Sequence, residues 1–424
     1  METTGCVVVG GGPAGMMLGL LLARAGVDVT VLEKHADFFR DFRGDTVHAS
    51  TVRLIDELGL GEEFRRLPQS RLTNVAFPVP GGRPVVMGNF ESLPPPYNYV
   101  ALMPQWDFLN FLAEAAAAEP SFTLRMSSTA TALVRNGGRV TGVRYRAADG
   151  TEGELRADCV VATDGRHSTL RRAAGLAPKE YRVPFDTWWF RLPRYPSEPG
   201  AVAGIVPAFG RGEALLALNR NDYYQMGYLA PKGTDARIRD EGIERFRQRI
   251  AELRPDLADR VDAIASLADL HWLDVRLDRL RDWHINGLLC IGDAAHAMSP
   301  AGGVGINLAI QDAVAAADCL APALLRGRVS RADLAKVERR RRMPTVVVQT
   351  VQRVMHRLLF EPIMTGQRAG APAVLLFLAR HIPAAGRVVP RFVAFGPRPE
   401  HAPAFARRTG ARPGPCPSPP STAP

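Results

Sequence analysis

Residues 5–34 read GCVVVGGGPAGMMLGLLLARAGVDVTVLEK, in which two β-branched runs flank a glycine-rich turn and an apolar stretch. The pattern predicts a strand over residues 6–9 that is buried on both faces, a helix over residues 16–25, and a second strand over residues 29–33. A βαβ unit of about thirty residues in this order opens many doubly wound α/β proteins. We therefore expect an α/β fold that begins with a Rossmann-type domain.

The glycine-rich turn predicts a dinucleotide site. Gly10, Gly12 and Gly15 allow a tight turn, a close backbone approach to a pyrophosphate and close packing of the helix on the strand, with the phosphates at the helix N-terminus. Glu33 follows Gly15 by 18 residues and is placed to accept hydrogen bonds from a ribose. An acid there favours adenosine without a 2′-phosphate, hence FAD or NAD. Further candidate contacts of this ligand are Pro13, Ala14 and Lys34.

A second glycine-rich loop follows a buried strand late in the chain. After the apolar run Leu288 to Ile291 come residues 292–307, GDAAHAMSPAGGVGIN. Asp293 can bind a sugar-like hydroxyl, and the glycines expose backbone N–H groups at the start of a helix expected over residues 305–325. A helix N-terminus stabilises negative charge such as a reduced flavin carries. A plain NAD dehydrogenase needs no such loop, so the pair of loops favours a flavin enzyme; we expect His296 to orient the loop rather than transfer protons.

Composition narrows the class of protein. The chain has 424 residues, 46% hydrophobic and 23% charged, which is typical of a globular protein with two or three domains. Its net charge of +10 comes with arginines spread along the whole sequence, so we expect no nucleic-acid partner and interpret the run Arg339 to Arg342 as a solvated helix face. Five cysteines without a CxxC pair predict neither a metal site nor structural disulfides, and we expect a cytoplasmic protein.

Three motifs occur in the order GGGPAG at residues 10–15, CVVATDGRHSTLRR at residues 159–172 and LLCIGDAAHAMSPAGGVGINLAIQDA at residues 288–313. In these motifs the chain resembles the class A FAD-dependent aromatic hydroxylases, of the para-hydroxybenzoate hydroxylase and ubiquinone-biosynthesis hydroxylase type, over about residues 5–400. The resemblance implies an FAD-binding Rossmann-type domain with an inserted mixed β-sheet substrate domain and C-terminal helices.

The resemblance also implies roles for single residues. Gly10, Gly12, Ala14 and Gly15 would hold the FAD pyrophosphate, Glu33 the adenosine ribose, and Gln105 and Asp293 the ribityl chain, while Pro300, Gly302, Gly303, Gly305, Ile306 and Asn307 would line the isoalloxazine. Asp164 and Gly165, supported by Arg166 and Arg171, match a motif associated with both FAD and NAD(P)H, although a solvated surface is an equal alternative for the two arginines. The catalytic candidates are Arg43, His48 and Pro300. Arg43 would contact the pyrophosphate near the path of the nicotinamide cofactor. For His48, a purely structural role fits the sequence equally well.

The reaction implied by the resemblance is hydroxylation of an aromatic or polycyclic molecule. NADPH or NADH, bound transiently, would pass hydride to FAD, and dioxygen would then give a flavin C4a-hydroperoxide that delivers oxygen to an electron-rich ring. The protein would hold the substrate and exclude water. Candidate substrate contacts are Trp189, Tyr223 and Tyr224, with ordinary sheet core as the alternative reading. In a strand over residues 185–192, alternation places Thr187, Trp189 and Arg191 on one face and Asp186, Trp188 and Phe190 on the other.

The motifs and the composition along the chain suggest a division into domains. We expect an FAD-binding domain in residues 1–180 with an insertion of strands at about 73–100, a substrate-binding sheet domain in 181–275, the second part of the FAD-binding domain in 276–335, helices in 336–404 and a disordered proline-rich tail in 405–424. Alternating stretches predict an antiparallel excursion from Phe122 to Arg146 that turns at Asn136 to Gly138.

Other functions remain compatible with these motifs. The same fold serves flavin reductases, epoxidases and halogenases, although the WxWxIP motif of tryptophan-type halogenases is absent. A flavoprotein that binds its ligand without turnover is a further alternative. We expect no membrane-spanning segment, but weak peripheral contact through a helix around Val374 to Leu378 stays open, as does the choice between monomer and homodimer.

Overall fold

The computed structural model describes residues 2–39, 46–77, 85–195, 198, 204–205, 207–220, 223–372, 377, 381 and 385–408. Its largest sheet has eight strands, in the order β20-β21-β11-β1-β2-β8, with β10 and β9 continuing from β11. These strands are β1 (Glu2–Val9), β2 (Val29–Leu32), β8 (Phe122–Arg125), β9 (Thr129–Asn136), β10 (Arg139–Arg146), β11 (Glu152–Ala162), β20 (His284–Ile285) and β21 (Leu288–Cys290). The predicted opening βαβ unit is present, and β1 runs parallel to both β2 and β11.

One part of the predicted antiparallel excursion is wrong. β9 and β10 do form an antiparallel hairpin that turns through Gly137 and Gly138, both at positive φ. Residues Phe122–Arg125, however, form β8 and pair in parallel with β2. The alternating pattern identified a strand there, but the choice of neighbour depends on the helix that precedes it, because a helical crossover returns the chain in the same direction.

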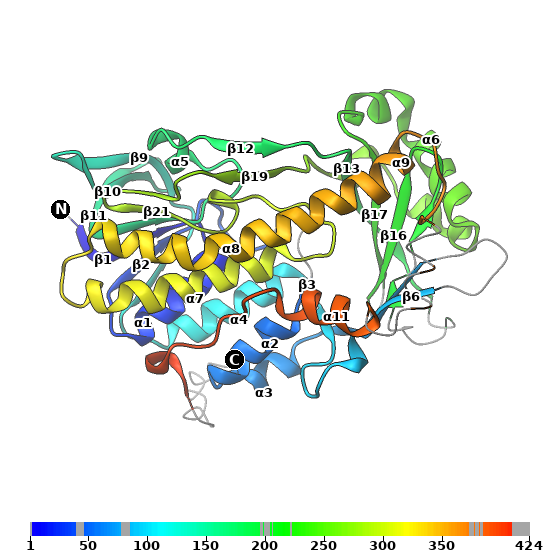
Figure 1. The fold of residues 1–424 in the computed structure, drawn as a ribbon. Helices are drawn as coiled ribbons and strands as arrows, with labels where there is room; N and C mark the ends of the chain where they lie inside the picture. The colour runs from blue at the N-terminus through cyan, green and yellow to red at the C-terminus, as the bar shows by residue number, and fades with distance from the viewer. Residues whose placement is uncertain are drawn as a thin grey trace, which may run out of the picture.

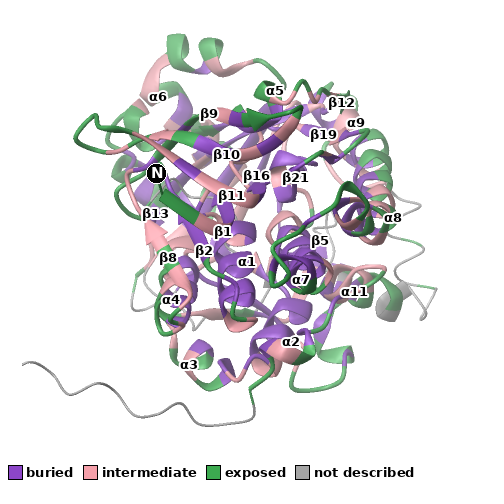
Figure 2. Ribbon diagram, turned by 90° about the vertical axis from the view of Figure 1, so that its left-hand side faces the viewer, coloured by how far each residue is buried: buried purple, intermediate pink, exposed green. Residues whose placement is uncertain are grey.

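Helices form a layer on one face of this sheet (Figure 1). They are α1 (Pro13–Arg24), α4 (Gln105–Ala117), α7 (Gly305–Leu324) and α8 (Arg331–Met355). Burial explains the largely apolar sequences of α1 and α7: Met16, Leu20 and Leu22 on α1 are fully buried, and α7 packs between α1 and α8. Figure 2 shows both helices as buried over most of their length.

A second, antiparallel sheet lies to one side of the first, at the right of Figure 1. Its order is β15-β16-β17-β13-β18, with β13 (Phe185–Pro193), β15 (Ala208–Phe209), β16 (Ala214–Asn219), β17 (Tyr223–Pro231) and β18 (His271–Leu273). One face is covered by α6 (Asp235–Leu253) and the 3-10 helix η2 (Pro255–Ala263). Sequence reasoning expected strands throughout this region and missed α6, whose many charges obscure its apolar stripe.

Short elements join the two sheets. A ribbon of β12 (Pro178–Tyr181) and β19 (Leu277–Leu280) connects them, and two three-stranded sheets are built from β3 (Thr46–Val47), β4 (Ser70–Leu72) and β7 (Val100–Leu102), and from β5 (Asn74–Phe77), β6 (Val85–Asn89) and β14 (Gly204–Ile205). The remaining elements are α2 (Ala49–Glu57), α3 (Gly61–Arg66), α5 (Thr169–Ala173), α9 (Glu361–Met364), α11 (Ala385–Phe395), the π-helix His356–Phe360 and the 3-10 helices η1 (Phe90–Ser92), η3 (Leu267–Asp269), η4 (Gly292–Ala294) and η6 (Ala404–Ala406).

The C-terminal segment closes on the first domain. Of the tail expected to be disordered, residues 405–408 are ordered around η6, where the Ala406 carbonyl accepts a hydrogen bond from Arg24, and residues 409–424 lie outside the described residues. Most of the proposed membrane-contact helix around Val374 also lies outside them. Among the described helices, none is both long enough and apolar enough to cross a bilayer.

Candidate cofactor and substrate site

The candidate site lies at the carboxyl ends of three neighbouring strands. β1 ends at Val9, β11 at Ala162 and β21 at Cys290, and each is followed by one of the three sequence motifs. The ends are tied together, because Thr163 donates its backbone N–H to the Val9 carbonyl and Ile291 donates to the Ala162 carbonyl. In open α/β sheets this edge is where ligands bind.

The glycine turn has the shape that a pyrophosphate needs. Gly10 has φ +110°, and a Cβ on it would lie 2.5 Å from the Thr163 carbonyl oxygen. A Cβ on Gly15 would lie 1.9 Å from the Gly10 carbonyl oxygen, so this position admits only glycine. In contrast, a Cβ on Gly12 would meet no atom within 4 Å. Gly10 and Gly15 therefore shape the turn, and Gly12 borders open space at the start of α1.

Glu33 lies directly behind this turn. Its carboxylate is buried and accepts hydrogen bonds from the backbone N–H groups of Gly11 at 2.7 Å and His35 at 2.9 Å. These bonds fix the acid at the end of β2, next to the glycines. Lys34, the next residue, is exposed.

The second glycine-rich loop packs against the first. A Cβ on Gly292 would lie 3.3 Å from the Ala14 Cβ and 3.2 Å from the Ala309 Cβ, which shows how closely this loop fits between α1 and α7. Asp293 lies at the surface of this junction and pairs with Arg166 at 3.3 Å. Arg171 is buried and donates to the carbonyls of Arg166 and Ala294, so it joins the second motif to the third rather than lying in solvent.

The end of this loop is anchored to β3 and α2. Thr46 donates its hydroxyl to the Gly303 carbonyl at 2.8 Å. The Asn307 side chain accepts from the His48 N–H and the Thr51 hydroxyl and donates to the Thr46 carbonyl. The Asn307 side chain therefore joins the loop to β3 and α2. Gly302 and Gly303 have φ of +84° and +63°, which the loop needs to turn into α7.

These features fit FAD. The N-termini of α1 and α7 carry no side-chain cap and no acidic residue in the first turn, so both leave backbone N–H groups open. Two such helix ends at one sheet edge suit an anionic pyrophosphate at α1 and the electron-rich edge of a flavin at α7. Gln105 begins α4 and is half-buried.

Two of the candidate site residues have structural partners. The Asp164 carboxylate accepts from the Ser168 hydroxyl and the backbone N–H groups of Thr169 and Leu170, so it caps α5. Its predicted contact with the cofactor stays a prediction. His48 is buried, its Nδ1 lies 2.7 Å from the Val393 carbonyl, and burial lowers its pKa to about 4. The bond to α11 gives His48 a structural partner, and the catalytic role stays a prediction. Arg43 lies outside the described residues.

A buried ionic network supports the loop from behind. His296 lies 2.5 Å from Asp312, which also accepts from Arg341 at 3.0 Å, and Arg341 continues to Glu400. His296 therefore orients the loop, in agreement with its predicted role. The solvated-face interpretation of the arginine run is wrong for Arg341, whose side chain is 0% exposed. The sequence signal for this ion pair is Asp312 itself, an aspartate within the largely apolar α7.

The substrate candidates divide between the two faces of the second sheet. Tyr224 pairs across from Leu192 and packs in the cluster beneath α6, and its hydroxyl donates to Glu198. Trp189 lies on the other face and packs against the cluster that contains Met298 and Val304 of the glycine loop. Tyr223 shares that face, where the Arg191 guanidinium lies 4.6 Å from its ring centroid. Tyr224 is therefore separated from the site, whereas Trp189 and Tyr223 face toward it.

The same face carries buried polar atoms that have no hydrogen-bond partner among the described residues. These are the Trp189 indole Nε1 and the Thr187 hydroxyl, two positions apart on β13. Buried donors without partners are rare in proteins and indicate a ligand or ordered water. Thr187 was not among the candidates from sequence; its alternation with Trp189 is the signal that places it there.

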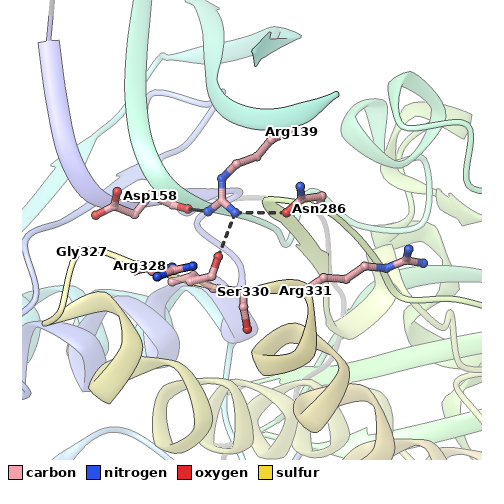
Figure 3. A pocket seen from close by; sticks show the side chains of 8 residues that line it. Arg139, Asp158, Asn286, Gly327, Arg328, Ser330 and Arg331 are labelled. Atoms are coloured by element: carbon pink, nitrogen blue, oxygen red, sulfur yellow. Dashed lines mark hydrogen bonds between the residues drawn. The ribbon is translucent and has the colours of Figure 1, made fainter. Parts of the chain in front are cut away.

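A pocket of about 610 Å³ lies elsewhere, near the amino end of β21. Figure 3 shows Arg139 at its centre, and this guanidinium donates to the Asp158 carbonyl, the Val329 carbonyl and Asn286. These bonds tie β10 to the segments before α8. The pocket is at the opposite end of the strands from the glycine loops, so its arginine serves the fold rather than the candidate site.

Comparison with known proteins agrees with this site. A family model described as FAD binding domain matches residues 2–353. The 6-methylpretetramide 4-monooxygenase of Streptomyces rimosus is 36% identical over 399 residues, which cover 93% of this chain and 92% of that protein. The anhydrotetracycline hydroxylase OxyS of Streptomyces rimosus has a similar structure, with a TM-score of 0.73 at 25% identity over 96% of this chain and 80% of that one. The p-nitrophenol 4-monooxygenase PnpA of Pseudomonas putida DLL-E4 shares the fold, with a TM-score of 0.74 at 21% identity over 94% of this chain and 100% of that one.

Proposed function

Since the chain belongs to the FAD binding domain family and is an FAD-dependent monooxygenase that hydroxylates aromatic compounds with NAD(P)H and O2, we propose that its substrate is a fused polycyclic phenol. Two relatives are named for a pretetramide and an anhydrotetracycline, which supports a substrate of that kind. When bound, FAD accepts hydride from the nicotinamide cofactor and activates dioxygen. The chain itself positions the ring and excludes water.

We place FAD along the two glycine loops. Gly12 and the N-terminus of α1 would face the pyrophosphate, Glu33 the ribose, Gln105 and Asp293 the ribityl chain, and Pro300, Gly302, Gly303, Gly305, Ile306 and the backbone of Asn307 the flavin ring. The substrate would lie between that ring and the face of β13 that bears Trp189. The observation that carries this proposal is the buried indole N–H of Trp189, which has no acceptor among the residues that the structure describes, because a carbonyl or phenolic oxygen would supply one.

Anaerobic stopped-flow reduction of the bound flavin tests the proposed function. NADPH and NADH are mixed with the protein, with and without single-ring phenols and fused polycyclic phenols. We expect one nicotinamide donor to reduce the flavin much faster when a polycyclic phenol is present, and the oxygenated product to carry one added oxygen by mass spectrometry. Acceleration by single-ring phenols alone would contradict the polycyclic assignment.

Replacement of Trp189 by phenylalanine tests the proposed substrate contact. The ring and its packing against Met298 and Val304 remain, but the indole donor is lost. Loss of one hydrogen bond to the ligand predicts a Kd for the polycyclic phenol about fivefold to tenfold higher, with unchanged FAD content. Tyr224→Phe removes a hydroxyl from the opposite face of the same sheet and is the matched control, with an expected Kd equal to that of the wild type. Equal Kd values for the wild type, Trp189→Phe and Tyr224→Phe would show that the Trp189 indole does not bind the substrate.

A further inference from the structure

Helix α8 directs a row of buried polar side chains at the loop that contains Pro300. Gln349, Gln352 and His356 follow one another at helical spacing on its inner face, and each is no more than 3% exposed. Buried amides are costly unless their hydrogen bonds are made, so a row of them on one helix face indicates a specific partner.

All three side chains bond to residues 297–301: Gln352 and Gln349 bond to backbone atoms there, and His356 bonds to the Ser299 side chain. Gln352 accepts from the Ser299 N–H at 3.3 Å and donates to the carbonyls of Ser299 at 2.8 Å and Ala301 at 2.9 Å. Gln349 donates to the carbonyls of Asp278 at 2.6 Å and Ala297 at 3.4 Å. His356 Nε2 lies 2.9 Å from the Ser299 hydroxyl.

This stretch lacks the regular backbone hydrogen bonds of a helix or strand. Residues 297–301 belong to no helix or strand, and Pro300 has no N–H to donate. Buried carbonyls in such a loop need donors from elsewhere, and Gln352 of α8 supplies them to Ser299 and Ala301.

Helix α8 also reaches the second, antiparallel sheet, which contains β13. It runs along the first sheet and ends beside the second (Figure 1), where the helix widens into the π-helix His356–Phe360. The His356 ring meets Phe185 of β13 edge-on, with ring centroids 5.5 Å apart. α8 and the π-helix that continues it therefore contact both the loop that contains Pro300 and β13, the strand proposed to bind substrate. Single π-turns of this kind are frequent at functional sites.

We propose that Gln352, assisted by Gln349 and His356, is a positioning residue that sets the distance between the Pro300 loop and the substrate sheet. The inference rests on the proposed function, because this distance determines how close the substrate ring lies to the flavin. When the loop shifts, reduced flavin still reacts with dioxygen, but the oxygen is released as hydrogen peroxide rather than transferred. A misplacement on the order of 1 Å is enough to lower transfer about a hundredfold.

The test compares Gln352→Met with Thr345→Val. Methionine keeps the length of glutamine but makes none of its hydrogen bonds. Thr345 is buried on the same helix two turns earlier, and its hydroxyl donates to the Arg341 carbonyl at 2.9 Å. Its valine variant is therefore matched for loss of a buried hydrogen bond in α8. The readouts are the visible spectrum and Kd of bound FAD, the melting temperature, and the fraction of consumed NAD(P)H recovered as hydrogen peroxide.

We expect Gln352→Met to bind FAD with a Kd close to that of the wild type, because the α1 pyrophosphate site is intact, yet to change the vibronic shape of the flavin spectrum and raise the peroxide fraction severalfold. Thr345→Val should match the wild type in both. An unchanged spectrum and peroxide fraction in Gln352→Met, or the same changes in Thr345→Val, would overturn the proposal. If the wild type hydroxylates no polycyclic phenol, the proposed function fails, while the spectra of the two variants still decide the positioning role.

Discussion

Replacement of Gly15 by alanine is expected to give a chain that no longer retains FAD and melts at a lower temperature than the wild type. The added Cβ would lie 1.9 Å from the Gly10 carbonyl oxygen and 2.8 Å from the Thr163 hydroxyl. Alanine favours helices, so the local propensity of α1 does not oppose the change; the steric overlap does. Forced displacement of a packed backbone costs about 1–3 kcal/mol or more, and the displaced turn is the one that shapes the pyrophosphate site.

Gly12→Ala provides the control for this prediction. Its Cβ would meet no protein atom within 4 Å, and Gly12 has φ −74°, which alanine adopts without strain. We expect the apoprotein to melt at the wild-type temperature, while the Kd for FAD rises because the methyl group occupies the approach of the pyrophosphate. Calorimetry of the apoproteins and fluorescence titration with FAD separate the two effects. Full FAD retention by Gly15→Ala would contradict the prediction and show that the backbone of the turn can shift to accommodate the added Cβ.

Replacement of Arg341 by methionine is expected to lower the free energy of unfolding by about 3–5 kcal/mol, because it leaves buried carboxylates without their cation. Arg341 and Asp312 are both 0% exposed, and Glu400 is 5% exposed. Urea unfolding followed by circular dichroism measures the loss. Arg339→Met, on the exposed side of the same arginine run, should change stability by less than about 0.5 kcal/mol. Adding Asp312→Asn to Arg341→Met should recover part of the loss, which a pure packing defect would not allow.

The same network predicts how stability depends on pH. Burial alone raises the pKa of Asp312, but His296 and Arg341 outweigh it and hold the pKa below its ordinary value. A carboxyl whose pKa is lowered by folding stabilises the native state above its unfolded pKa, near about 4, and loses this contribution as pH falls through the folded value. Acid unfolding of the wild type should therefore be steeper below about pH 4 than that of Asp312→Asn.

Local features of the fold could be predicted from sequence, and long-range ones could not. The turn at Gly10 to Gly15 and the acid at Glu33 obey spacing rules that act within one βαβ unit, and the structure places them as expected. The sequence did not predict that the Asn307 side chain holds Thr46 and His48, some 260 positions earlier. A periodic pattern of apolar residues does not reveal a contact between residues so far apart in the sequence.

The same limit applies to the faces of the second sheet. Tyr223 and Tyr224 are adjacent in sequence, and alternation states that they point to opposite sides, but not which side meets the flavin loop. That depends on α6, which covers the face of Tyr224 and leaves Trp189 for the loop. Likewise, four consecutive arginines predict a helix surface, and only the packing of α8 on α7 places Arg341 beside Asp312.

The order of strands in the main sheet has a consequence for synthesis on the ribosome. The second half of β11, with Val160 and Val161, has its outer edge paired only with β21, whose first residue is Leu288. At about 5–20 residues per second, a nascent chain would expose this apolar, unpaired edge for roughly ten seconds before its partner emerges. We expect chains truncated before Leu288 to aggregate, and soluble expression of the full chain to improve when a chaperone is co-expressed.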